Sequence, residues 1–172
     1  MFGRRTAAAP AVTETYRMQQ KMLSFGDDFW IENGLGQRAY HVDGKVLRLR
    51  KTFKLQDAEG RDLLDIHSKV LRVRDTFVIE RDGAAVATLH KALVGIRDRF
   101  TVDVADGADL HAHGNIVDHE YAIGRDGADV AQVSKEWLRA RDTYSVAIAQ
   151  GEDVPLILAI VVCIDAIGHT GR

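Results

Sequence analysis

The chain lacks the features of a disulfide-stabilised protein and of one that binds nucleic acid through its overall charge. Cys163 is its only cysteine, which excludes an internal disulfide and a cysteine-rich zinc site and favours a reducing, cytoplasmic setting. Its 23 Lys and Arg residues against 25 Asp and Glu leave a net charge of -2. We therefore expect no nucleic-acid partner, and any anion-binding surface must be a local patch.

A long apolar segment is also missing. The longest run, Val154 to Ile164, is far shorter than the roughly 20 residues that a membrane-spanning helix requires. No polar stripe recurs along it at helical spacing, so it predicts a helix buried on all sides rather than a surface helix. Asp153 is a suitable N-cap, Pro155 suits the first turn, and Gly168 can end the helix.

Length and composition fit one globular domain. The 172 residues are 46% hydrophobic and 28% charged, which is typical of a folded chain with a real core. The N-terminal stretch has no apolar core of the kind that a signal peptide needs. We expect residues 1–15 to form a flexible tail and residues 16–172 to form the domain.

An internal repeat runs through the chain. At an offset of 44 positions, Phe77–Val104 aligns without a gap with Tyr121–Ile148. At an offset of 48, Lys21–Glu32 aligns with Lys69–Glu80. In both alignments, residues of chemically different types recur in the same order, which indicates a repeated structural unit.

The repeated unit has the pattern of a β-hairpin. Apolar residues alternate on either side of Asp82-Gly83 and of Asp126-Gly127, the dipeptide that a tight hairpin turn favours. Asp43-Gly44 predicts the same turn, and Asp57 to Gly60 predicts a looser one. The spacing gives about twelve short strands. A barrel of that size can enclose a helix, so we expect a mainly β fold, a closed antiparallel barrel around the apolar C-terminal helix.

The sequence resembles the LURP-one-related family of the tubby-like C-terminal superfamily, which includes the phospholipid scramblases. The resemblance rests on Gln20–Phe29, Gly114-Asn115 followed by Asp118–Tyr121, Val133–Lys135 with Trp137, and Asp142–Tyr144. It implies a twelve-stranded barrel around a central helix. It implies little about activity: tubby domains bind phosphoinositide head groups through a cationic face, scramblases are associated with lipid movement, and the plant members with defence. This chain departs from the family by having Arg72, Arg74, Arg139 and Arg141 where the family tends to carry Trp or Ser.

Paired arginines are the main candidate for a ligand-binding site. Arginines two positions apart on a strand project to the same side, and their planar guanidinium groups suit phosphate oxygens. The alternative is an ordinary solvated face on which each arginine lies beside its own aspartate. The candidate ligands for an anionic head group are Arg48, Arg50, Arg72, Arg74, Arg97, Arg139 and Arg141.

The stretch Asp106 to Glu120 is a weaker candidate. It contains His111, His113 and His119, and two histidines two apart on a strand share a face, as a metal site would require. The spacing matches no known metal motif, and the nearby glycines indicate turns, so we expect no metal.

Two residues of the apolar segment raise the question of catalysis. For Asp165 the simplest expectation is a barrel mouth with solvent or an arginine as partner, and Cys163 is expected to be inert packing. No catalytic motif is present, so we expect neither a catalytic residue nor a cofactor. Three functions stay open: a non-enzymatic module for anionic phospholipid or phosphoinositide-like head groups, peripheral to the membrane; a protein-interaction scaffold; and a hydrolase or metal-binding protein.

Overall fold

The computed structural model describes residues 13–19, 28–47, 50–71, 74–92, 99–135 and 143–168. This part of the chain forms twelve strands followed by the helix α1, Val154–Gly168. The helix bounds confirm the predicted segment and its end at Gly168. The strands are β1 (Thr13–Gln19), β2 (Phe29–Asn33), β3 (Arg38–Leu47), β4 (Arg50–Asp57), β5 (Asp62–Leu71), β6 (Arg74–Arg81), β7 (Ala84–Ala92), β8 (Arg99–Val104), β9 (Leu110–Asn115), β10 (Glu120–Arg125), β11 (Ala128–Lys135) and β12 (Thr143–Ala149).

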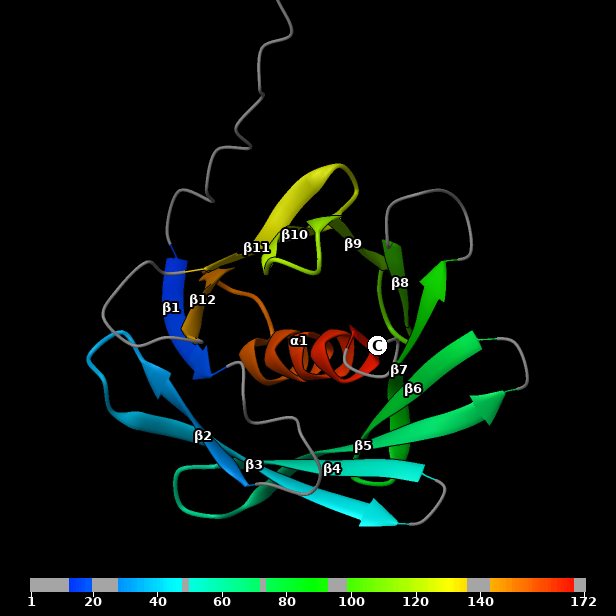
Figure 1. Ribbon diagram of the computed structural model, residues 1–172, viewed down its shortest axis with the longest axis horizontal. Helices are drawn as coiled ribbons and strands as arrows, with labels where there is room; N and C mark the ends of the chain where they lie inside the picture. Colours follow the sequence, from blue (N-terminus) through cyan, green and yellow to red (C-terminus); the bar gives the residue numbers. More distant parts are fainter. Residues whose placement is uncertain are drawn as a thin grey trace, which may run out of the picture.

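The twelve strands close into one antiparallel barrel. Each strand pairs with its neighbours in sequence, and β1 pairs with β12 over all seven of its residues to close the ring. Figure 1 shows the ring of strands with α1 inside it. The fold predicted from the repeat and from the apolar helix is therefore confirmed.

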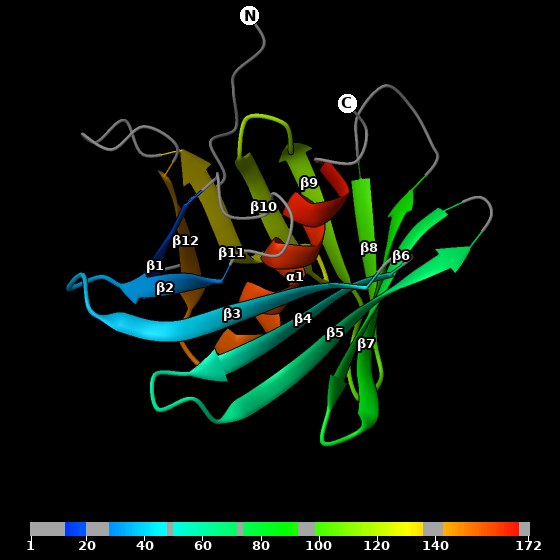
Figure 2. The ribbon, with the colours of Figure 1, turned by 60° about the horizontal axis from the view of Figure 1, so that its bottom comes forward.

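The helix fills the barrel. Every residue from Leu156 to Ile167 is buried, and alternate strand residues such as Leu55, Ile79 and Val133 are completely buried against the same core. In Figure 2 the helix runs from one end of the barrel toward the other. A twelve-stranded barrel is too wide for its own side chains to fill, which explains why the helix is apolar on every side.

The hairpin turns test the predicted turn chemistry. Asp82 and Gly83 have φ angles of 52° and 80°, and Asp126 and Gly127 have 51° and 81°, as the tight turn requires. The looser turn is also present, with the Gly60 amide donating to the Asp57 carbonyl oxygen at 3.1 Å.

The predicted turn at Asp43-Gly44 is wrong. Both residues lie inside β3, where Asp43 pairs with Lys54 and Gly44 with Phe53. A glycine can also adopt the extended conformation. Here long-range pairing with β4 overrides the local turn preference of the dipeptide.

A β-bulge recurs in the aligned copies of the repeat. The pairing register shifts between Ile31 and Glu32 in β2, between Ile79 and Glu80 in β6, and between Ile123 and Gly124 in β10. These positions are equivalent at the offsets of 48 and 44 residues. The repeat therefore encodes the same bend in each copy, and a bend of this kind helps a sheet curve into a barrel.

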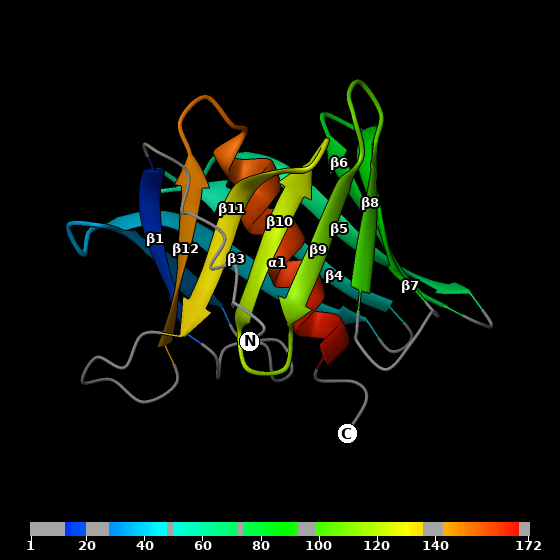
Figure 3. The same ribbon diagram turned by 90° about the horizontal axis from the view of Figure 1, so that it is seen from above.

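The two ends of the barrel are distinct. Because successive strands are antiparallel, the connections alternate between the ends. The end that receives the last turn of α1, which we call the Asp165 end, is where β1, β3, β5, β7, β9 and β11 finish. The other, the Asp153 end, is where α1 begins. Figure 3 shows α1 passing behind β9 to β12 between these ends.

Candidate functional site

Two of the seven predicted arginines have a described backbone position, and both lie at the same end of the barrel. Arg50 and Arg74 are the first residues of β4 and β6, and both strands begin at the Asp165 end. The strands on either side of the remaining five also finish or begin there. Those five, Arg48, Arg72, Arg97, Arg139 and Arg141, lie outside the described residues, as do the side chains of Arg50 and Arg74.

Other cations lie at the same end, with described side chains. Lys69 near the end of β5, Arg99 at the start of β8 and Lys135 at the end of β11 are all exposed. None of the three forms an ion pair with another residue of the described ranges. Of the carboxylates here, Asp118 accepts a hydrogen bond from Asn115 Nδ2 at 2.7 Å, and Glu120 accepts one from the Lys135 amide at 2.8 Å.

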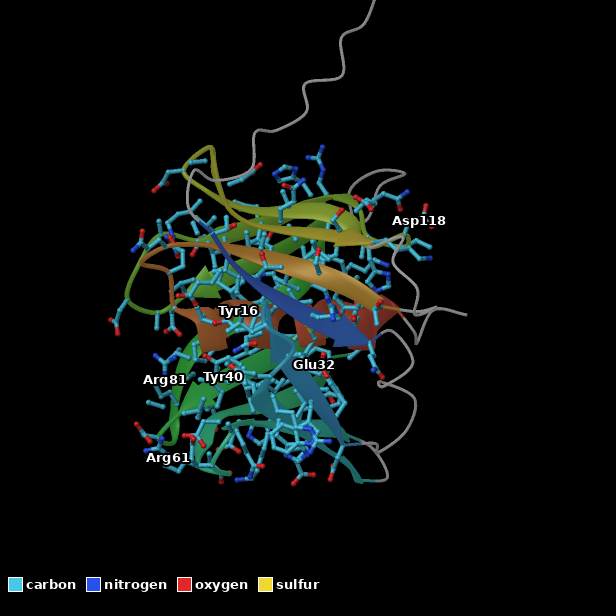
Figure 4. The ribbon with its side chains drawn as sticks, turned by 90° about the vertical axis from the view of Figure 1, so that its left-hand side faces the viewer. Tyr16, Glu32, Tyr40, Arg61, Arg81 and Asp118 are labelled. Atoms are coloured by element: carbon cyan, nitrogen blue, oxygen red, sulfur yellow. The ribbon has the colours of Figure 1, made fainter. Side chains whose placement is uncertain are left out.

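The Asp153 end has the opposite character. Three of the four arginines in and beside its turns pair with carboxylates: Arg61 Nε lies 2.6 Å from Asp57 Oδ2, Arg81 Nη2 lies 2.8 Å from Asp153 Oδ2, and Arg125 Nη1 lies 2.8 Å from Glu152 Oε1. The fourth, Arg38, lies over the Trp30 ring, 5.0 Å from its centroid. Figure 4 shows Arg61 and Arg81 on the side opposite Asp118. The connections at this end contain one arginine, Arg61, and the carboxylates Glu59, Asp82, Asp106, Asp109, Asp126, Glu152 and Asp153.

The three histidines of the Asp106–Glu120 stretch do not converge. His111 and His113 lie on the exposed face of β9, and His113 Nε2 is 3.3 Å from Asp129 Oδ1 on β11. His119 is buried in the core instead. Within the described part of the chain, no group of three or more His, Cys, Asp and Glu side chains is arranged to hold a metal ion.

A buried polar cluster lies where α1 reaches the Asp165 end. Asp165 Oδ1 is 3.0 Å from His119 Nε2, and the Tyr144 hydroxyl donates a hydrogen bond to Asp165 Oδ2. The His119 and Tyr144 rings stack with their centroids 4.4 Å apart. The described partners of Asp165 are thus a histidine and a tyrosine, and its side chain is buried rather than open to solvent.

Burial keeps the tyrosines of this region protonated. Loss of water raises the pKa of Tyr144 and of Tyr121 well above the ordinary value, and the nearby Asp165 charge raises both further. Tyr144 can therefore only donate to the carboxylate. The Tyr121 hydroxyl is completely buried and has no hydrogen-bond partner among the described residues.

Sequence reasoning singled out Asp165 but missed its partners. His119 is 46 positions away and Tyr144 is 21 positions away, and neither sits at a spacing that predicts contact with a helix. The usable signal was weak: an aspartate in an otherwise apolar run must find polar partners somewhere in the core.

Cys163 is completely buried, and burial raises the pKa of its thiol. The thiolate, which is the reactive form, is therefore suppressed. This agrees with the interpretation of Cys163 as packing.

Comparison with known proteins agrees with the barrel. The chain matches the solved structure of an Arabidopsis thaliana protein with a TM-score of 0.69 and 18% sequence identity, over 95% of this chain and 94% of that one. At that identity the similarity shows a shared fold. No curated protein matches the chain in sequence, and no helix in the described part of the chain is long and apolar enough to cross a bilayer. A family model, LURP-one-related, matches residues 14–165. The chain belongs to the LURP-one-related family.

Proposed function

We propose that this protein is a non-enzymatic binding module that attaches to anionic phospholipid or phosphoinositide-like head groups through the Asp165 end of its barrel. The observation that carries the proposal is the separation of charge between the two barrel ends. The net charge of -2 conceals a difference between an acidic Asp153 end and an Asp165 end that presents the exposed cations Lys69, Arg99 and Lys135.

The described cations support an anion-binding surface. Lys69, Arg99 and Lys135 are exposed and unpaired within the described ranges, whereas Arg61, Arg81 and Arg125 at the other end are paired with carboxylates. Cations that are not already neutralised are available to lipid phosphates. Each such cation near an anionic surface contributes about 1 kcal/mol, and salt screens the attraction.

The connecting segments at the Asp165 end carry six Lys and Arg residues and six carboxylates, so they are neutral overall, whereas those of the Asp153 end carry one arginine and seven carboxylates. Five of the seven candidate arginines fall in segments that join strands at the Asp165 end, which supports the proposal that they contribute to one anion-binding surface. Guanidinium groups match phosphate oxygens in geometry as well as in charge. The carboxylates of the Asp153 end are repelled by the same membrane, so the module should bind end-on.

Vesicle sedimentation tests the proposal. Phosphatidylcholine vesicles that contain phosphatidylserine should retain the protein, retention should fade as salt is added, and vesicles of phosphatidylcholine alone should not retain it. Changing Arg72, Arg74, Arg139 and Arg141 to Ser should abolish retention. A matched control removes four arginines from the Asp153 end, Arg38, Arg61, Arg81 and Arg125, and should retain binding.

Two results would overturn the proposal. One is equal retention on neutral vesicles, which would remove the role of charge. The other is equal loss of retention in the two variants, which would show that overall charge acts rather than the Asp165 end. Circular dichroism of both variants should confirm that they remain folded.

A further inference from the structure

Apolar burial alone defines the depth and rotation of the central helix only weakly. From Val154 to Ile164 its side chains are all apolar apart from the buried thiol of Cys163. Hydrophobic burial is not directional. A shift of the helix along the barrel, or a rotation about its axis, would exchange one apolar side chain for another. Specific polar contacts can therefore add to the shape of the packed side chains in fixing one position.

At the Asp153 end these contacts lie near the surface. Asp153 Oδ1 accepts a hydrogen bond from the Leu156 amide at 3.2 Å, as an N-cap does, and Asp153 also pairs with Arg81. Glu152 forms two hydrogen bonds with Arg125, at 2.8 and 2.9 Å. The two pairs are partly exposed, with 38% and 39% of the side chain accessible in the first and 34% and 17% in the second. Solvent screens partly exposed pairs of this kind, which limits what each contributes to stability.

At the Asp165 end the contact lies inside the core. The His119 and Asp165 side chains are only 5% and 3% exposed, and the Tyr144 hydroxyl donates to the same carboxylate. The carboxylate therefore receives hydrogen bonds from two different places on the barrel: the β9–β10 turn, which contains His119, and the start of β12, which contains Tyr144.

His119 adopts an unfavourable backbone conformation in order to make this contact. Its φ angle is 54°, in the left-handed region that residues other than glycine rarely adopt. The turn is held in that shape by the His119 amide, which donates to the Ile116 carbonyl oxygen at 3.2 Å, and by the Asn115–Asp118 hydrogen bonds. This conformation brings the ring of a turn residue into the core instead of leaving it in solvent.

We propose that Asp165, His119 and Tyr144 form a latch that fixes the depth and rotation of α1 and ties the Asp165 end of the barrel to it. A buried carboxylate without its partners is strongly unfavourable. A displaced helix would separate Asp165 from His119 and Tyr144, so the latch penalises every alternative position of the helix. Such use of a buried polar group, to select one register in an apolar interface, is its best-attested role. The latch does not depend on whether the Asp165 end binds lipid.

A double-mutant cycle tests the latch. The variants are Asp165→Asn, which keeps the shape of the side chain, His119→Asn, whose new residue tolerates a positive φ angle, and the two together. We expect the pair to be coupled by about tenfold or more in the unfolding equilibrium constant, measured in urea. The matched control is the cycle of Asp129→Asn and His113→Asn, the same residue types at 3.3 Å but with side chains 19% and 56% exposed. There the coupling should be less than about threefold.

Hydrogen exchange distinguishes a latch from a general stabilising contact. In Asp165→Asn, the last turn of α1, the β9–β10 turn and the start of β12 should exchange about tenfold faster or more, while the first turns of α1 keep their protection. Should Asp165→Asn fail to fold, Tyr144→Phe removes a single hydroxyl and should show the same local pattern. Coupling no greater than in the control cycle, or exchange that rises equally at both ends of the helix, would overturn the proposal.

Discussion

Shortening Leu158 to alanine is expected to destabilise the protein strongly, because this side chain lies in the middle of the helix that fills the barrel. Leu158 is 0% exposed, as are its neighbours Ala159 and Ile160. The surrounding strands belong to a closed ring, so they cannot collapse freely into the space that the missing methyl groups leave.

The expected loss follows from the cost of a core cavity. Truncating a fully buried leucine to alanine costs about 2–5 kcal/mol, with the upper part of the range where the surroundings cannot relax. A domain has only about 5–15 kcal/mol of stability in total. For a chain of this size, each 1 kcal/mol lowers the melting temperature by roughly 2–4 °C. Leu158→Ala should therefore melt roughly 5–20 °C below the wild type.

The assay is urea unfolding followed by circular dichroism, with Leu35→Ala as the matched control. Leu35 is 84% exposed, so the same chemical change should alter the free energy of unfolding by no more than about 0.5 kcal/mol. A loss below about 1 kcal/mol for Leu158→Ala, or equal losses for the two variants, would refute the conclusion that α1 packs as the barrel core.

Three further predictions concern single sites. Gly114→Ala should lower the free energy of unfolding by well over 1 kcal/mol, because a Cβ there would lie 2.8 Å from the Glu120 carbonyl oxygen. Gly60 also has a positive φ angle but open space around it, so Gly60→Ala should lower it by only about 1–2 kcal/mol. Equal melting temperatures of the two variants would contradict this difference. Cys163 should react with a thiol reagent only as fast as the protein unfolds, since it is buried and burial raises its pKa; rapid labelling of the folded protein would disprove this. Tyr121→Phe should keep wild-type stability within about 0.5 kcal/mol, because its hydroxyl has no described partner; a clear loss in urea unfolding would show that the hydroxyl is bonded after all.

The elements that local chemistry determines could be predicted from the sequence. Asp82-Gly83 and Asp126-Gly127 form the expected turns because the dipeptide tolerates positive φ angles where a tight hairpin needs them. The helix could be predicted because a segment that is apolar on every side must be buried. The turn predicted at Asp43-Gly44 is absent because this dipeptide pairs with β4 inside β3. That long-range pairing cannot be predicted from local turn preferences.

The two candidate sites depend on closure of the barrel. Asp165 meets His119 and Tyr144 only because the β9–β10 turn and the start of β12 surround the last turn of α1. The segregation of charge has the same origin. Lys69, Arg99 and Lys135 lie far apart in the sequence, and the antiparallel order of the strands brings them to one end. A net charge near zero gives no sign of this arrangement.

If the protein meets an anionic membrane with the Asp165 end of its barrel, an environment-sensitive fluorophore at that end should enter the bilayer surface and one at the other end should stay in water. Val117, 56% exposed in the β9–β10 turn, marks the Asp165 end, and Leu35 in the β2–β3 turn marks the other. Each is changed to cysteine and labelled in turn, while buried Cys163 stays unlabelled. On phosphatidylserine-containing vesicles the emission of the Val117 label should shift to the blue, and that of the Leu35 label should not. A blue shift at Leu35 instead, or the same shift at both positions, would contradict end-on binding.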